Sequence, residues 1–352
     1  MQPPMNLPDS TMGRRAFITG RVVLDDGTPL TESAIIQTIC QGHRRTVAHT
    51  DSHGGFSFEF GDRMGDAAAG ISAADVDSSY GLPGAGRGNQ REWRSCELQA
   101  ELPGFTSQAF DLSSRMSTFE SADIGRLVMH RMGQVEGFTI SATSALAPKD
   151  AQKAFEKGRE KENKQKWDEA QPWFEKAVQI YPKYAVAWFE LGHIQLRKKE
   201  NAKARNSFDQ SIAADPKYVN PYQGLADLNT QEEQWPAVVN VTEQLLVLNP
   251  VSFPDAWFRN ALGNYYLHNL AAAEKSARQG MKVDENHRLP KIEYLLGVIL
   301  MQKHEYKEAT AHIQNYLRVA TQPSEIEEAQ KRLAEITRVS ASVSDPASSD
   351  KK

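Results

Sequence analysis

The side chains suited to catalysis or metal binding do not fall into recognised spacings in this sequence. None of the nine histidines begins an H-E-x-x-H or H-x-x-E sequence, so metallopeptidase ligand sets with those spacings are excluded. Residues 84–88 are rich in glycine but lack the Lys-Ser/Thr pair of a phosphate loop, and no G-x-S-x-G elbow occurs. His49 and His53 flank a turn and are interpreted as solvated turn residues. We therefore predict no catalytic residue, no metal and no cofactor, and an enzyme with an unrecognised site is the least favoured class.

The only two cysteines are Cys40 and Cys96. Their separation excludes a two-cysteine zinc knuckle and a C-x-x-C redox site. They either form a disulfide, which would close a long loop, or pack as two buried thiols. The residues leave both alternatives open, and the placement of both cysteines in predicted strands of one small domain slightly favours the disulfide.

Length and charge limit the architecture and the partners. A chain of 352 residues is long enough for two domains, and a net charge of −4 does not indicate a nucleic acid or an acidic membrane as the main partner. No run approaches the ~20 apolar residues of a membrane span. No lysine precedes Lys149, and this change in composition marks a domain boundary.

A pair of arginines near the start bears on localisation. Residues 13–18 look like a twin-arginine export signal, but polar residues follow where an apolar region is needed, so we read them as leading into the first strand. Periplasmic or exported localisation is favoured if a signal precedes this sequence, and cytoplasmic localisation otherwise.

The first half is predicted to be an antiparallel β-sandwich over residues 15–141, after a disordered tail at 1–14. Alternation places Phe56, Phe58 and Phe60 on one face of a strand. Residues 61–90 have almost no periodicity and are interpreted as a mobile insert. Strands are expected at 16–24, 34–40, 44–50, 56–60, 95–102, 105–112, 124–131 and 136–141.

The turns of this half carry a resemblance to a known family. Residues 18–23 and 26–30, followed by Thr50-Asp51 and by Gly54 with Phe56, resemble the carboxypeptidase regulatory-like domain. The resemblance implies a transthyretin-like sandwich, similar to CnaB modules, with a structural or adhesive role. The wider class is called carbohydrate-binding-like, so binding of carbohydrate or envelope polymer is the alternative function. The isopeptide crosslink of CnaB relatives cannot form within this domain because it has no lysine.

The second half repeats itself with an offset of 34 residues. Residues of matching size recur at Gly158 and Gly192, Ala170 and Ala204, Phe174 and Phe208, Ala177 and Ser211, and Pro182 and Pro216. A period of this length indicates stacked helical hairpins, and the pattern resembles the tetratricopeptide repeat (TPR). We predict a linker at 142–149, five repeats within 150–323 (151–184, 185–218, 219–252, 254–287 and 290–323), a capping helix at 324–338 and a disordered tail at 339–352. The fold class is therefore multidomain, a β-sandwich followed by an all-α TPR solenoid.

The TPR resemblance implies that the first helix of each hairpin lines a concave binding face. The implied partner-binding residues are Phe155, Arg159, Asn163, Phe189, His193, Arg197, Gln223, Asp227, Phe258, Tyr265 and Tyr294. The family's Lys-Asn carboxylate clamp is absent, because Phe, Gln or Tyr occupies the lysine position. Aromatics beside charges suit a peptide with apolar anchors, although these rings equally suit packing of hairpin on hairpin. Trp188, Phe174 and Phe208 are predicted core. We predict a non-catalytic scaffold that binds a protein or peptide.

Overall fold

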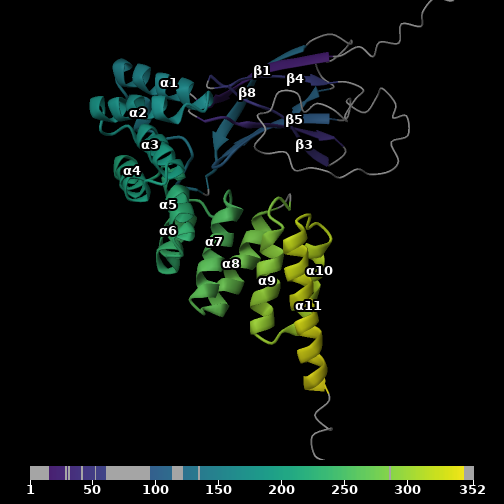
Figure 1. Cartoon of the computed structure of the whole chain (residues 1–352). Coiled ribbons are helices and arrows are strands. Elements are labelled where there is room, and N and C mark those ends of the chain that lie inside the picture. The colour runs from purple at the N-terminus through teal and green to yellow at the C-terminus, as the bar shows by residue number, and fades with distance from the viewer. Residues whose placement is uncertain are drawn as a thin grey trace, which may run out of the picture. The chain divides into compact units, whose positions relative to one another are not determined.

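The chain divides into two compact units, Met1–Met132 and Gly133–Lys352. The computed structural model describes residues 16–27, 30, 32–40, 43–51, 53–60, 96–112, 122–133, 135–284 and 287–344. The first unit contains the strands and the second contains the helices (Figure 1). The tail predicted at 1–14 and the insert predicted at 61–90 lie outside the described residues.

The strands of the first unit are hydrogen bonded into one sheet. They are β1 (Ala16–Leu24), β2 (Ile35–Cys40), β3 (His43–His49), β4 (Gly55–Phe60), β5 (Cys96–Leu102), β6 (Phe105–Ser107), β7 (Phe110–Asp111) and β8 (Ala122–Arg131). The order is β3-β2-β5-β6-β8-β1-β4, with β7 paired to β5. The β1–β8 pair is parallel and the other pairs are antiparallel. A sandwich of two separate sheets is not confirmed, because the short β6 pairs with both β5 and β8 and so continues the ladder.

Alternating side chains of these strands form the core of the first unit. Ile18 and Leu98 are fully buried, while the residues that flank them along each strand are more exposed. Ile36 is fully buried too, but in β2 the next two residues, Gln37 and Thr38, are buried with it. Phe56 and Phe58 are buried with their ring centroids 6.4 Å apart, as the alternation predicts. The side chain of Phe60 lies outside the described part of the structure. Period-two patterning therefore identified the core face correctly.

The turn before β4 depends on glycine and on a carboxylate. Gly54 has a φ of +78°, and a Cβ at this position would lie 2.2 Å from the carbonyl oxygen of Val22. Oδ1 of Asp51 accepts hydrogen bonds from the backbone N–H groups of His53 and Gly55, each at 2.8 Å. His53 is exposed in this turn, as the sequence predicts.

The last predicted strand of the sandwich, 136–141, belongs to the helical unit instead. Instead of the predicted pairing in the sheet, its backbone forms hydrogen bonds with residues at and between the helices. A β-bridge joins Phe138 to Tyr218. We call residues 135–147 the strap. It takes up most of the predicted linker 142–149 and ends in a 3₁₀ turn at Ser144–Leu146. Strand-forming residues therefore gave an extended conformation here without a place in the sheet.

The second unit consists of consecutive helix pairs and a final helix. The pairs are α1 (Lys149–Asn163) with α2 (Trp167–Ile180), α3 (Ala185–Arg197) with α4 (Asn201–Ala214), α5 (Asn220–Gln231) with α6 (Trp235–Leu248), α7 (Pro254–Tyr266) with α8 (Leu270–Val283), and α9 (Lys291–Gln302) with α10 (Tyr306–Leu317). The final helix α11 (Pro323–Ser344) extends beyond the predicted cap 324–338. Residues 339–344 are therefore helical, contrary to the predicted tail, and 345–352 lie outside the described residues.

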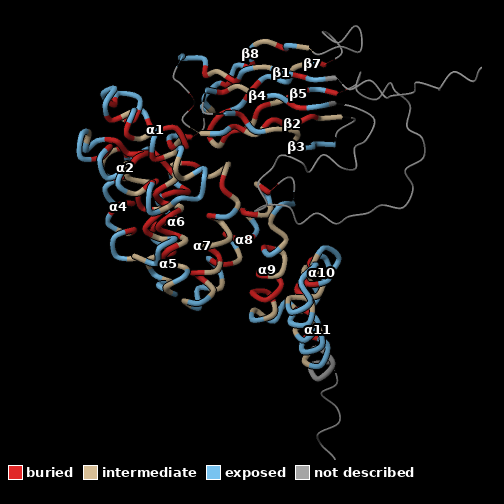
Figure 2. The backbone as a smooth tube through the Cα atoms, turned by 45° about the horizontal axis from the view of Figure 1, so that its top comes forward, coloured by how far each residue is buried: buried red, intermediate tan, exposed pale blue. Residues whose placement is uncertain are grey.

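Close packing within and between hairpins depends on phenylalanine facing glycine. A Cβ at Gly192 or Gly224 would lie 2.7 Å from the Phe208 ring, and one at Gly158 would lie 2.7 Å from Phe174. Both rings are fully buried, which confirms them as core. Figure 2 shows such buried stretches alternating with exposed ones along the helices.

Trp188 is only partly buried, so its prediction as a core residue is wrong. The side chain packs against the cluster formed by the first two hairpins, and its Nε1 donates a hydrogen bond of 2.9 Å to the carbonyl oxygen of Pro182. The indole therefore lies over the loop between α2 and α3, where solvent reaches part of the ring.

The turns inside the five hairpins place a residue other than glycine in the left-handed region. These residues are Gln165 (φ 56°), Lys199 (62°), Glu233 (55°), His268 (60°) and His304 (65°). At the second turn, the N–H of Glu200 bonds to the carbonyl of Gln195, which satisfies the end of α3 in the manner of a Schellman cap.

We expect Lys199→Gly to stabilise the protein. The left-handed conformation costs a side-chain-bearing residue roughly 1–2 kcal/mol, and the entropy of glycine offsets part of the gain. The expected net increase in unfolding free energy is about 0.5–1 kcal/mol, measurable by urea denaturation. Lys203→Gly, placed inside α4, is the control and should destabilise by about 1 kcal/mol; equal effects of both substitutions would contradict the assignment.

Candidate functional site

The predicted binding residues all lie on the first helix of a pair. Phe155, Arg159 and Asn163 are on α1, Phe189, His193 and Arg197 on α3, Gln223 and Asp227 on α5, Phe258 and Tyr265 on α7, and Tyr294 on α9. Side chains connect α1 to α3, α5 to α7 and α7 to α9. Arg159 bonds to Glu190, Asp227 lies 2.5 Å from Arg259, and the Tyr265 hydroxyl accepts from Gln302 at 3.0 Å. We call this common surface, formed by α1, α3, α5, α7 and α9, the first-helix face.

Two carboxylates and one guanidinium meet at the junction of α1 and α3. Nη1 of Arg159 donates to Oε1 of Glu190 and lies 3.8 Å from Oε2 of Glu162. Glu190 is buried, and Oε2 of Glu162 is buried without a hydrogen-bond partner. The guanidinium forms its hydrogen bond with Glu190 and lies farther from Glu162. Burial and the nearby negative charge of Glu190 therefore raise the pKa of Glu162 to about 7.

We expect this raised pKa to make stability depend on pH. The protonated Glu162 carboxyl is favoured in the folded protein, because its pKa there lies above the ordinary 4.5. Its contribution to stability is fully present below pH 4.5 and is lost as the pH rises through about 7. The unfolding free energy should therefore fall between those pH values. Glu162→Gln should remove this fall and add about 1–3 kcal/mol at pH 8, measured by denaturation at several pH values. Glu160→Gln, an exposed neighbour, should keep the wild-type slope; an unchanged slope in Glu162→Gln would contradict the assignment.

His193 and Arg197 lie on the α3 part of the face. Burial lowers the pKa of His193, whose ring lies 4.8 Å from that of Phe189. The Arg197 guanidinium lies 4.6 Å from the centre of the Trp167 ring, a cation–π contact. His193 is half-buried in this face, while Arg197 remains exposed to solvent.

Two of the predicted aromatic anchors are half-buried and contact rings of the hairpin cores. The Phe155 ring lies 5.5 Å from Phe174 and 5.1 Å from Tyr184. The Phe189 ring lies 6.1 Å from Phe208 and 5.8 Å from Tyr218. For these two residues the structure favours the packing alternative. Asn163 is exposed and Gln223 is half-buried on the same face.

The second half of the face is aromatic. Phe258, Tyr265 and Tyr294 are half-buried, and Tyr266 is 50% exposed with its ring stacked 4.1 Å from Trp235. The Tyr294 hydroxyl donates to Glu328 of α11 at 3.0 Å, and burial together with this bond raises the pKa of Tyr294 to about 12. The final helix therefore continues the face beyond the fifth pair.

Several residues of this face were missed from the sequence. They are Glu162, Glu190, Arg259 and Gln302, with Glu328 on the final helix. A signal for two of them was present, because Arg159 and Glu190 are 31 residues apart and Asp227 and Arg259 are 32 apart, a separation that brings opposite charges together between successive first helices.

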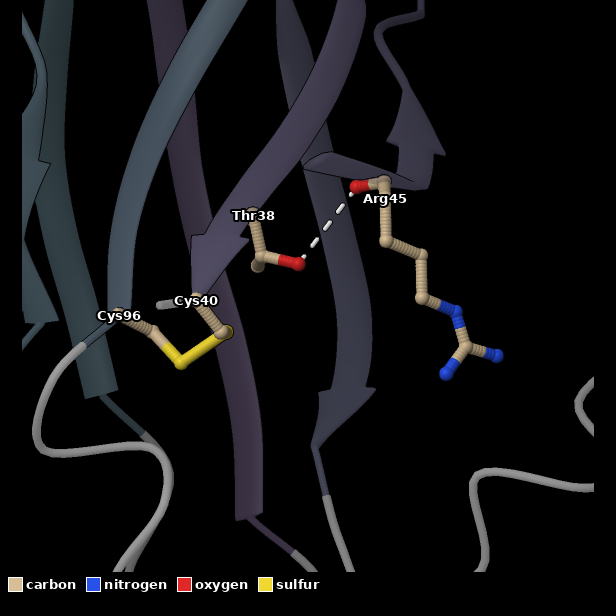
Figure 3. Close-up of a disulfide and its surroundings, with 4 residues drawn as sticks. All are labelled: Thr38, Cys40, Arg45 and Cys96. Atoms are coloured by element: carbon tan, nitrogen blue, oxygen red, sulfur yellow. Dashed lines mark hydrogen bonds between the residues drawn. A yellow bond between two sulfur atoms is a disulfide. The ribbon is translucent and has the colours of Figure 1, made fainter. Parts of the chain in front are cut away.

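The two cysteines are joined in the first unit, away from this set of residues in the sequence. Cys40 and Cys96 face each other across the β2–β5 ladder and form a disulfide with the Cα atoms 4.2 Å apart (Figure 3). Thr38 donates a hydrogen bond of 3.5 Å to the carbonyl of Arg45, whose side chain points away from the sulfur atoms in Figure 3.

Within the described residues, no three His, Cys, Asp or Glu side chains are grouped so that they could hold a metal ion. The helices of the described part include none with the length and apolar character of a membrane span.

Comparison with known proteins matches the helical hairpins. Residues 162–228 match the sequence model of the tetratricopeptide repeat family. The helical unit is a TPR-like solenoid. A tetratricopeptide repeat protein from Parabacteroides merdae is similar over 55% of this chain and 76% of its own, at 18% identity and a TM-score of 0.48. PilF of Pseudomonas aeruginosa is similar over 53% and 84%, at 14% identity and a TM-score of 0.46.

YrrB, described as a TPR protein with an unusual peptide-binding site, is similar over 52% of this chain and 92% of its own, at 16% identity and a TM-score of 0.46. No relative is found among curated proteins. A TPR-like fold points generally to a scaffold for protein–protein interaction.

Proposed function

We propose that this chain is a non-catalytic scaffold whose first-helix face binds a protein or peptide, with the strand unit as a structural or adhesive module. The observation that carries the proposal is the division of the face into two kinds of surface. Exposed charge lies on α1, α3 and α5, where Arg159 and Asp227 are each 40% exposed. Half-buried aromatics follow on α7 and α9.

This division suggests what the partner offers. An extended or helical peptide would place polar groups against Arg197 and Asp227 and an apolar side chain against Phe258 and Tyr265. Phe155 and Phe189 are half-buried as well, but each ring contacts a fully buried phenylalanine of its own hairpin, so we place the anchors at Phe258 and Tyr265. The proposed contact therefore combines charge at one end with aromatic contact at the other.

The test is selection of peptides from a displayed random library with the full chain. We expect selected peptides to bind the double variant Arg197→Ala with Asp227→Ala at least about 10-fold more weakly, since one or two exposed polar contacts are lost. The matched control is Glu243→Ala with Lys275→Ala, which removes one acid and one base from exposed positions on α6 and α8. Equal affinity of the two double variants would contradict the proposal. Binding of a glycan array that neither double variant alters would favour the carbohydrate alternative.

A further inference from the structure

The strap crosses the loops that connect successive helix pairs. At its carboxyl end, Oγ of Ser144 accepts from the N–H of Val186 at 3.1 Å, and the Tyr181 hydroxyl donates to the carbonyl of Thr143 at 3.3 Å. Tyr181 lies in the connection between α2 and α3, and Val186 lies in the first turn of α3. The strap therefore holds the first junction from both sides.

The middle of the strap holds the second junction. The N–H of Phe138 donates to the carbonyl of Lys217 at 2.9 Å, and the N–H of Val219 donates back to the carbonyl of Phe138 at 3.0 Å. The hydroxyl of Ser141 donates to Oδ2 of the buried Asp215 at 2.7 Å. These bonds connect the strap to both sides of the loop between α4 and α5.

The start of the strap holds the third junction. The N–H groups of Glu136 and Gly137 both donate to the carbonyl of Leu248, and Nδ2 of Asn249 donates to the carbonyl of Gly137 at 3.2 Å. A Cβ on Gly137 would lie 2.6 Å from Val219 and 2.7 Å from Leu248. The strap therefore lies directly against the backbone of the loop after α6.

The fourth junction is organised differently. Asp284 lies at the end of α8, where Asp215 and Asn249 lie at the ends of α4 and α6. Its carboxylate accepts from the N–H groups of Arg288 at 3.0 Å and Leu289 at 2.8 Å, within its own loop. Asp215 and Asn249 also accept hydrogen bonds from N–H groups of their own loops, and they bond to the strap in addition. The hydrogen bonds described for the Asp284 carboxylate stay within its own loop.

In a solenoid each repeat normally contacts only its neighbours, so that stability is a sum of repeat and interface terms. A segment bonded to three successive junctions adds a coupling that reaches beyond neighbours. We propose that the strap makes the first three helix pairs, α1 to α6, one cooperative unit, whereas α7 to α11 open separately at lower free energy. The charged part of the first-helix face thus lies on the coupled unit and the aromatic part on the separately opening one. This inference does not depend on what binds that face.

Hydrogen–deuterium exchange on the full chain tests the proposal, with all substitutions placed on the strap. Gly137→Val should displace the strap, so that amides of α3 to α6 exchange at least 10-fold faster while those of α7 to α10 change less than 2-fold. Ser141→Ala loses one hydrogen bond to a carboxylate and should give about a 10-fold effect on the same helices. Leu146→Ala, at a side chain that is 75% exposed, is the control and should have no effect.

A third strap variant, Thr139→Val, is expected to change the exchange rate in the opposite direction. Oγ1 of Thr139 is buried without a hydrogen-bond partner, and the residue is 3% exposed. Thr139→Val should therefore slow exchange throughout α3 to α6. If circular dichroism shows that Gly137→Val is unfolded, the exchange rates of Ser141→Ala and Thr139→Val test the coupling by the strap. Acceleration spread equally over α3 to α10, or confined to the contacted loop amides, would overturn the proposal.

Discussion

Phe208→Ala is expected to lower the unfolding free energy of the helical unit by about 3–5 kcal/mol. The ring is fully buried between Gly192 and Gly224, and neither glycine has a side chain that can move into the space left behind. The substitution therefore removes the contacts of one hairpin with the next as well as those within its own hairpin. Urea denaturation monitored by circular dichroism at 222 nm measures the loss.

The matched control for Phe208→Ala is Val247→Ala, a helical apolar residue that is 81% exposed. It should change the unfolding free energy by less than about 0.5 kcal/mol. A loss below about 2 kcal/mol for Phe208→Ala would mean that neighbouring side chains collapse into the site, against the close ring-to-glycine contact. Gly224→Ala should also destabilise, because its Cβ would need the space of the ring.

Removal of the disulfide is expected to destabilise the strand unit by about 2–4 kcal/mol. Cys40 and Cys96 are separated by 56 positions, and the bond restricts the unfolded chain over that whole loop. The double variant Cys40→Ser with Cys96→Ser should therefore show faster amide exchange in β2 and β5. Reduction of the wild type by dithiothreitol should produce the same change.

Thr46→Ser, an exposed substitution on β3, is the control for handling and should leave exchange in β2 and β5 unaltered. Exchange that is identical with and without dithiothreitol in the wild type would contradict a stabilising disulfide. The helical amides should not respond in either case, because both cysteines belong to the first unit.

The helical half could be predicted from sequence because its signal is repeated. The first two pairs show small and large residues at the same offsets, so that Gly192 facing Phe208 follows from Gly158 facing Phe174. The strand half offered no such repetition. Alternation located its strands, but the pairing of β6 with both β5 and β8 depends on contacts distant in the sequence.

The first-helix face shows the same limit at the level of side chains. The offsets placed Arg159 and Phe189 on the correct helices. They did not reveal that the arginine bonds to a buried glutamate or that the phenylalanine ring turns toward Tyr218. Residues 136–141 were assigned to a strand because an extended segment has the same alternation whether its hydrogen bonds go to a sheet or to loops.

The lengths of the connections differ along the solenoid. We count from the first residue of each connection to the left-handed turn residue of the next hairpin. This distance is 18 positions from Tyr181 to Lys199 and 18 from Asp215 to Glu233. It is 19 from Asn249 to His268 and 20 from Asp284 to His304. In the first two stretches, the strap bonds to residues on both sides of the connection. An added residue there would move Val219 out of step with Phe138, whereas one added after Asp284 would disturb the bonds that Asp284 makes within its own loop, to Arg288 and Leu289. For protein engineering, the place to insert a tag or a graft in this half is therefore the connection between α8 and α9.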